Sequence, residues 1–345
     1  MVAANGFDSS RGRGSNPVVP EHPVSTPIHA PMKIKRILLC LTSLGSCLLL
    51  SACATSAPIL DAAKSGDVAK VQAILNKTPA AVDAKSNGGS TALMFAASNN
   101  QVVVVRLLLD KGAAVDGRDK NGMTALMFAA RADRIDVVKV LLERGAAVDA
   151  RATFGATALL LAAEKDYLDV IVLLLDKGAA INAQDNEKWT ALMLAALNGH
   201  ADLVKLLLDK GAAVDVRSYD GGTALIAAAE KGHVDVVRQL LDKGAAVDAR
   251  MNDGTTALMM AAYNGYADVV KLLLDCGSIV DVRDNKGGTA LVAAALKGHA
   301  DVAKILLEKG ADPNIKTTGN STPLFLALSS GNDALINLLL AHGAK

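Results

Sequence analysis

The side chains that could take part in catalysis are few and evenly spaced. His200, His233 and His299 share one position of a repeating pattern, and tyrosine takes that position at Tyr167 and Tyr266. Residues at a shared position of a repeat stand about one unit apart, too far to share a metal ion. We therefore predict that these residues connect helices, and we expect no metal and no other cofactor.

Nucleophile and nucleotide motifs are missing as well. Cys276 is the only cysteine after residue 53, and no histidine adjoins it. The sequence contains no G-x-x-x-x-G-K-[ST], no H-E-x-x-H and no G-x-S-x-G. Carboxylates are numerous but evenly repeated, which is typical of structural residues. The sequence predicts that the chain is not an enzyme and has no small-molecule substrate.

Recognition of a protein partner has better support. Only five Phe, four Tyr and one Trp occur among 345 residues, so the core must be aliphatic. Large side chains nevertheless occupy variable positions in the middle of the chain, at Met123, Arg131, Phe154, Trp189, Tyr219 and Tyr263. Trp, Tyr and Arg dominate the energetics of protein interfaces. We predict that these six are exposed and bind the partner. The alternative is that they pack on neighbouring turns.

Composition narrows the class of partner. Lys and Arg number 36 against 35 Asp and Glu, a formal net charge of +1. Nucleic-acid-binding domains normally carry a basic excess, so we expect no nucleic-acid partner. Hydrophobic residues make up 51% of the chain, which is enough to build a core.

The elements that position these residues repeat every 33 residues. A threonine followed by Ala-Leu, or once by Pro-Leu, recurs at Thr91, Thr124, Thr157, Thr190, Thr223, Thr256, Thr289 and Thr322. A glycine follows 21 residues after each threonine, and Asp or Asn lies four residues beyond all but the last of these glycines. Eight units in phase indicate one repeat domain.

Each unit reads as two short helices. Thr190 can cap a helix over residues 191–196, because its hydroxyl can accept an unpaired N–H of the first turn. A second helix covers residues 203–208, and Gly211 suits the left-handed conformation that ends it. Helices this short are unstable alone, so the units must be stabilised by stacking.

The period and the Thr-Ala-Leu or Thr-Pro-Leu start resemble the ankyrin repeat, whose signature is T-P-L-H-x-A. The resemblance covers residues 58–345, with 58–90 as a divergent ninth unit that caps the N-terminus. It implies an all-α solenoid of about nine stacked helix-turn-helix units that binds protein partners through turn tips and first helices. The signature histidine is apolar in every unit, from Met94 to Phe325. We predict that these apolar residues pack between units and form an additional apolar column along the stack.

A basic residue precedes each threonine by six positions, at Lys85, Arg118, Arg151, Arg217, Arg250, Arg283 and Lys316, with Gln184 as the neutral exception. This column could meet an acidic partner. We favour local ion pairs with turn aspartates such as Asp149 and Asp248, which contribute little to stability.

The residues before the repeats also show an ordered pattern. Residues 32–53 read MKIKRILLCLTSLGSCLLLSAC, a basic start followed by a mainly apolar run at 37–50. That run is shorter than the ~20 residues of a membrane span and fits a signal peptide. Its end, Leu50-Ser51-Ala52-Cys53, resembles the lipobox of bacterial lipoproteins. The resemblance implies removal of residues 32–52, lipidation of Cys53 and a short tether at 53–57.

The resemblance also implies a location in the bacterial cell envelope. Ala54 follows the cysteine, which favours the outer membrane over the inner one, with the repeats facing the periplasm. Residues 1–31 are rich in Pro, Gly and Ser, and we interpret them as disordered or as an extension upstream of a true start at Met32. If the signal is not used, the alternative is a cytoplasmic ankyrin scaffold or enzyme regulator.

Overall fold

The structure, a computed structural model, describes residues 57–345. The predicted extension at 1–31, the signal peptide at 32–52 and Cys53 lie outside these residues. Within them, no helix is long and apolar enough to cross a bilayer.

The described residues form eighteen α-helices in nine pairs, with one 3-10 turn, η1 (Pro79–Asp83). The first helices of the pairs are α2 (Pro58–Ser65), α4 (Ala92–Ser98), α6 (Ala125–Arg131), α8 (Ala158–Ala163), α10 (Ala191–Asn198), α12 (Ala224–Lys231), α14 (Ala257–Asn264), α16 (Ala290–Lys297) and α18 (Pro323–Ser330). The second helices are α3 (Val68–Lys77), α5 (Val102–Asp110), α7 (Ile135–Glu143), α9 (Leu168–Asp176), α11 (Ala201–Asp209), α13 (Val234–Asp242), α15 (Ala267–Asp275), α17 (Ala300–Glu308) and α19 (Asp333–Ala341). The predicted all-α class and the nine units are confirmed.

The repeated threonines cap the first helices as predicted. In α10, Thr190 Oγ1 accepts a hydrogen bond from the Met193 N–H at 3.3 Å, and the same bond recurs in the other seven threonine units. Gly199 ends α10 with φ 76°, and Gly211 follows α11 with φ 87°. Both are left-handed conformations that glycine adopts without steric cost. Each repeat therefore fixes where its helices begin and end.

Stacking buries the apolar faces of these short helices. Each first helix packs on its own second helix and on the first helix of the next unit. The residue three positions after the capping threonine is buried in seven units, from Met94 in the first of these to Val292 in the last. The predicted additional apolar column is therefore confirmed for these seven units and is wrong for the last, where Phe325 is 57% exposed because no unit packs on it among the described residues. Most of the core consists of Ala, Val, Leu, Ile and Met.

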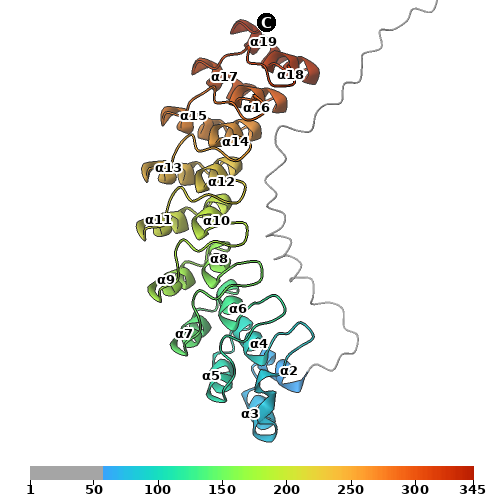
Figure 1. Cartoon of the computed structure of the whole chain (residues 1–345), viewed down its shortest axis with the longest axis vertical. Coiled ribbons are helices and arrows are strands. Elements are labelled where there is room, and N and C mark those ends of the chain that lie inside the picture. Colours follow the sequence, from blue (N-terminus) through green and yellow to red (C-terminus); the bar gives the residue numbers. More distant parts are fainter. Residues whose placement is uncertain (1–56) are drawn as a thin grey trace, which may run out of the picture. The chain divides into compact units, whose positions relative to one another are not determined.

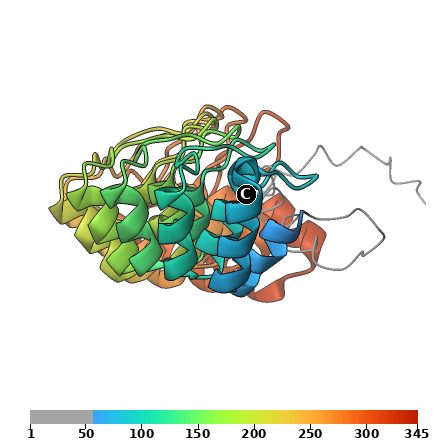
Figure 2. The same ribbon diagram turned by 90° about the horizontal axis from the view of Figure 1, so that it is seen from below.

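The stack of described residues is curved, with the first helices on its concave side and the second helices on its convex side (Figure 1). From α2 to α16, the first helices carry two consecutive buried alanines, such as Ala195 and Ala196 in α10, whereas second helices present Val and Leu. Helices separated by small side chains approach more closely, which accounts for the direction of the curvature. Viewed along the stack, the connecting loops gather along one edge (Figure 2).

Polar side chains also join neighbouring units. Asp149 Oδ1 accepts the Ala180 N–H at 3.0 Å, and Asp248 makes the equivalent contact with the Ile279 N–H at 3.2 Å. Arg118 Nη1 donates to the Arg151 carbonyl at 2.6 Å, and Arg217 bonds the Arg250 carbonyl in the same way. The predicted Arg–Asp pairs are therefore wrong: both columns instead form hydrogen bonds with backbone groups of the next unit.

Candidate functional site

The candidate site is the inner face of the stack, which we define as the loop tips together with the last turns of the first helices. The first helices line the concave side (Figure 1), so their last turns bring one side chain from each unit into a row. This row consists of the residues seven after each threonine: Ser98, Arg131, Glu164, Leu197, Glu230, Tyr263, Leu296 and Ser329. Their chemistry changes from unit to unit while the surrounding framework repeats.

The loop tips are held by a ladder of backbone hydrogen bonds. The Tyr219 N–H donates to the Glu187 carbonyl at 2.9 Å, and the Asn252 N–H donates to the Asp220 carbonyl at 2.9 Å. The Asn252 side-chain amide also donates to the Tyr219 carbonyl at 3.0 Å. These bonds fix each tip relative to the next, so the exposed side chains are positioned before any partner arrives.

An aspartate closes several of these loops from inside. Asp185 Oδ1 accepts the Glu187 N–H at 2.9 Å and the Trp189 N–H at 2.8 Å. Burial raises the pKa of Asp185, and these two hydrogen bonds oppose the shift because they favour the ionised form. Asp119 and Asp284 accept equivalent pairs of backbone N–H groups.

Four of the six predicted binding residues reach the surface. Tyr219 is 71% exposed at a loop tip, and Arg131, Phe154 and Tyr263 are partly exposed. They are spread over the middle of the stack, from Arg131 in α6 to Tyr263 in α14 four units later. Their role in binding a partner stays a prediction.

Met123 and Trp189 are buried, so their predicted exposure is wrong. Each residue directly precedes a capping threonine, and its carbonyl closes the loop by accepting the N–H of Asp119 or Asp185 at 3.1 Å. The side chain thus enters the stack at the base of the loop. For these two residues the alternative prediction, that the side chains pack inside the repeats and are not exposed, is the one that agrees with the structure.

Two partly exposed residues of the row take part in cation–π contacts. The Arg131 guanidinium lies 5.4 Å from the centroid of the Phe128 ring, and Lys297 Nζ lies 4.5 Å from that of Tyr263. Burial lowers the pKa of Arg131, an effect opposed by the nearby carboxylates of Glu164 and Asp119. Such contacts hold aromatic and cationic groups in fixed positions on the face.

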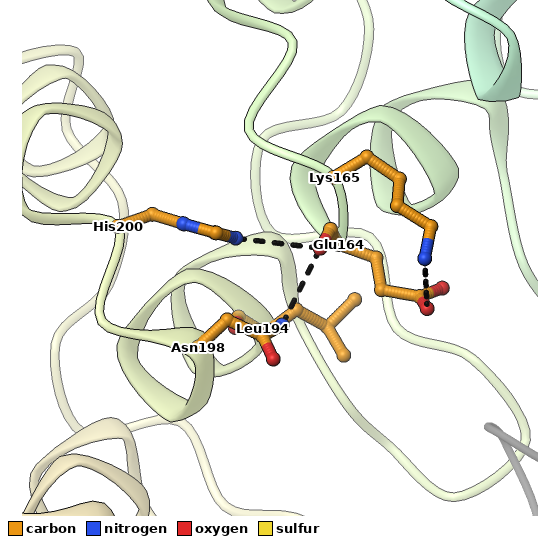
Figure 3. Close-up of polar contacts among 5 residues, drawn as sticks. All are labelled: Glu164, Lys165, Leu194, Asn198 and His200. Atoms are coloured by element: carbon orange, nitrogen blue, oxygen red, sulfur yellow. Dashed lines mark hydrogen bonds and ion pairs between the residues drawn. The ribbon is translucent and has the colours of Figure 1, made fainter.

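The central part of the row links two units (Figure 3). The Glu164 backbone carbonyl accepts a hydrogen bond from the Asn198 side-chain amide at 3.4 Å and lies 3.3 Å from His200 Nε2. The Glu164 carboxylate forms an ion pair with Lys165 at 3.4 Å. His233 and His299 contact carbonyls of their preceding units at 3.0 and 3.1 Å. As predicted, these histidines lie in the connections between the two helices of their own units, and their rings also contact the preceding unit.

Glu230 is a feature that sequence reasoning did not single out. Its side chain is only 7% exposed and lies in the last turn of α12. Oε1 contacts Lys231 Nζ at 3.0 Å, whereas Oε2 has no hydrogen-bond partner among the described residues. A buried carboxylate oxygen without a partner is energetically costly. The sequence showed only a glutamate in a variable column, which gives no signal of burial.

The described residues contain no group of three or more His, Cys, Asp or Glu side chains placed to hold a metal ion. Cys276 is exposed directly after α15, where the other units carry Lys, Arg or His. The variable row of the inner face combines aromatic, cationic, carboxylate, aliphatic and hydroxyl side chains.

Comparison with known proteins places the repeats in a family. A family model described as ankyrin repeats (3 copies) matches residues 59–152, 145–218, 214–284 and 276–345. Proteins named NAD-capped RNA hydrolase NUDT12 from Homo sapiens, Pongo abelii and Macaca fascicularis are each 44% identical over 50 residues. That match covers 14% of this chain and 11% of each relative, and it lies in the repeat region. Because the family model covers nearly all of residues 59–345, the chain belongs to the ankyrin repeat family.

Proposed function

We propose that the chain is an exported, lipid-anchored interaction module that binds a protein partner through the inner face of its central units. Ankyrin repeat domains are typical protein–protein interaction modules. The observation that carries the assignment to this face is Tyr219, which is 71% exposed although the chain has only ten aromatic residues. An exposed tyrosine on a rigid loop offers a large contact area at low entropic cost.

The neighbouring side chains extend this surface. Phe154 and Glu187 occupy the tips of the two preceding loops, and Arg131 and Tyr263 lie in the row of the inner face. Together they combine aromatic, cationic and acidic groups on a backbone fixed by the loop ladder. We propose that Arg131, Phe154, Tyr219 and Tyr263 contact the partner, whereas Met123 and Trp189 support the loops from beneath.

The lipid anchor is a second part of the proposal. Its support is the order of basic residues, apolar run and Cys53 within residues 32–53. Acyl chains contribute about 0.8 kcal/mol per buried CH₂, so several chains on one cysteine give stable anchoring. With the helices beginning at Pro58, the tether is short and the first unit would lie near the membrane surface. We propose the periplasmic side of the outer membrane.

The anchor is tested by labelling cells with radioactive palmitate. We expect label on the wild-type chain and none on Cys53→Ala, with Cys276→Ala as the matched cysteine control that keeps its label. Fractionation should place the wild type with outer-membrane markers. Equal labelling of the Cys53→Ala variant, or a cytosolic wild type, would reject the anchor without affecting the binding face.

The binding face is tested by comparing Tyr219→Ala with the wild type in cross-linking captures from envelope extracts. We expect one captured protein to be lost with Tyr219→Ala while the melting temperature stays unchanged, because an exposed ring stabilises the fold little. Val103→Ala, an exposed residue on the convex helix α5, serves as the control. Identical captures by all three proteins would contradict the proposal.

A further inference from the structure

One carboxylate in the middle of the inner face is buried with fewer hydrogen-bond donors than it needs. Glu230 lies in the last turn of α12, and its side chain is 7% exposed. Lys231 Nζ contacts Oε1 at 3.0 Å, whereas Oε2 has no hydrogen-bond partner among the described residues. An ionised carboxylate accepts about four hydrogen bonds, and buried polar atoms normally have at least one donor each. Glu230 therefore retains strong capacity to accept hydrogen bonds.

Stacking of the units does not require a carboxylate at this position. The equivalent residue is a leucine in two other units, Leu197 in α10 and Leu296 in α16, and Leu197 is 6% exposed. A leucine thus fits this position of the repeat and leaves no oxygen without a partner. A buried charge that is short of donors lowers stability, and such a cost is typical of a residue retained for binding.

This position of the repeat nevertheless opens toward the inner face. Glu164 and Tyr263 occupy it in other units, and both are partly exposed. The Glu230 side chain has three rotatable bonds, so a change of rotamer brings Oε2 to the same surface. Its neighbours in the row, Leu197 and Tyr263, carry no charge, and Lys231, the cation that contacts it, is itself 44% exposed and free to swing into solvent. A donor from a bound protein can therefore reach the carboxylate.

We propose that Glu230 binds an arginine side chain of the protein partner, an inference that deepens the proposed function and rests on it. A guanidinium carries five N–H donors in a planar fork that matches the two oxygens of a carboxylate. It is also more weakly hydrated than an ammonium, so it enters a nearly buried site at lower cost. A lysine of the partner would repeat the contact that Lys231 already makes, whereas an arginine supplies the donor that Oε2 lacks.

Replacing Glu230 separates a binding role from a structural one. Because leucine fits the equivalent position, we expect Glu230→Leu in the full-length chain to raise the melting temperature by about 2–4 °C. The matched control is Glu164→Leu, which removes a partly exposed carboxylate at the same repeat position, also paired with the lysine that follows it. It should change the melting temperature by less than about 1 °C. A lower melting temperature for Glu230→Leu would make Glu230 a structural residue and overturn the proposal.

Binding is measured with a defined probe, N-acetyl-arginine amide, by saturation-transfer NMR on the full-length chain. We expect a dissociation constant of about 1 mM, because a single side chain offers few contacts. N-acetyl-citrulline amide, which has the same shape without the charge, should bind at least about tenfold more weakly. The arginine probe should lose at least as much affinity for Glu230→Leu and none for Glu164→Leu. Equal binding to the wild type and Glu230→Leu would overturn the proposal.

The capture experiment tests the arginine on the partner. Treating the envelope extract with phenylglyoxal, which blocks arginine, should abolish the capture that depends on Tyr219, whereas acetylation of lysines should leave it intact. Glu230→Leu should lose the same captured protein. If nothing is captured but the arginine probe binds at Glu230, the result supports the arginine site and rejects the proposed binding face. If the Tyr219-dependent capture survives both phenylglyoxal and Glu230→Leu, the binding face stands and the arginine site is overturned.

Discussion

At the N-terminal end of the stack, Lys70 of α3 is exposed at a position where every later unit buries a Val or Leu. Asp61 and Lys64 are exposed on α2. At the C-terminal end, Phe325 and Leu328 keep or enlarge the apolar character of the positions that face the next unit. Among the described residues no further unit packs on either end, and one end exposes polar side chains whereas the other exposes apolar ones. The side chains at the two ends of the described stack thus differ in kind, whereas those at its internal junctions do not.

The interior units show why this difference is informative. Their junction residues are fixed by packing, since alanine occurs at the position of Leu328 in all eight earlier units. An end unit is free of that restraint, so its residues reflect solubility or binding. The contrast between a restrained interior and unrestrained ends leads to four predictions, from the largest expected effect to the smallest.

The largest effect should come from overpacking the interior. Ala229→Leu in α12 places a leucine where no space exists, and we expect it to lower the free energy of unfolding by about 3 kcal/mol. The reverse change at the end, Leu328→Ala, should alter it by less than about 0.5 kcal/mol. Urea unfolding followed by circular dichroism measures both. Equal effects would remove the distinction between the interior and the end.

Removing a helix cap should cost less. Thr223 is buried and its hydroxyl accepts the Ile226 N–H at 3.4 Å, so we expect Thr223→Ala to destabilise the fold by about 1–2 kcal/mol. Thr322 caps α18 in the end unit and is partly exposed, so Thr322→Ala should cost about 0.5–1 kcal/mol. Thr223→Ser, which keeps the hydroxyl, is the control. A larger loss at residue 322 than at residue 223 would contradict this order.

Removing a junction hydrogen bond should have a still smaller effect. Asp215 Oδ1 accepts the Ala246 N–H at 3.1 Å, and we expect Asp215→Ala to cost about 1 kcal/mol in unfolding free energy. Asp215→Asn should be close to neutral, because Asn182 makes the same bond at 2.9 Å. If the asparagine variant is as unstable as the alanine variant, charge rather than hydrogen bonding matters at this position.

The smallest effect concerns ion pairs on the convex side. The hydrogen bond from Lys309, 2.6 Å from Asp275, lowers the pKa of that exposed carboxyl. A lowered folded-state pKa gives stability that is present above the unfolded value, about 3.9, and is lost as the pH falls through the folded value. Melting temperatures of the wild type and Lys309→Ala should therefore differ slightly at pH 6 and converge below pH 3. A constant difference would indicate loss of packing.

Much of this architecture was predictable because each element depends on local chemistry. The threonine before every first helix and the glycines at Gly199 and Gly211 act within a few residues of chain, through a cap and a left-handed conformation. A strict period of 33 then requires equivalent units to stack in equivalent ways. The predicted apolar column followed from this reasoning, and it is confirmed from Met94 to Val292 but not at Phe325, which is exposed.

The surface was predicted less well, because variability at a repeat position does not reveal where a side chain points. Trp189 and Tyr219 are both aromatic and both vary between units, yet Trp189 closes the base of a loop and Tyr219 stands at a tip. The arginine column was given the wrong acceptors because the carbonyls it binds belong to the next loop. One signal was available and unused: Leu328 interrupts an otherwise unbroken alanine column.

The sequence by itself determined the number of units, their helices and their order, because capping, turn formation and helix periodicity act over short stretches of chain. Only the tertiary structure decided which variable residues lie at the surface, which backbone groups the Asp and Arg columns satisfy, and that the two ends differ. Those properties depend on contacts between residues about 33 positions apart, whose directions are set when the units stack.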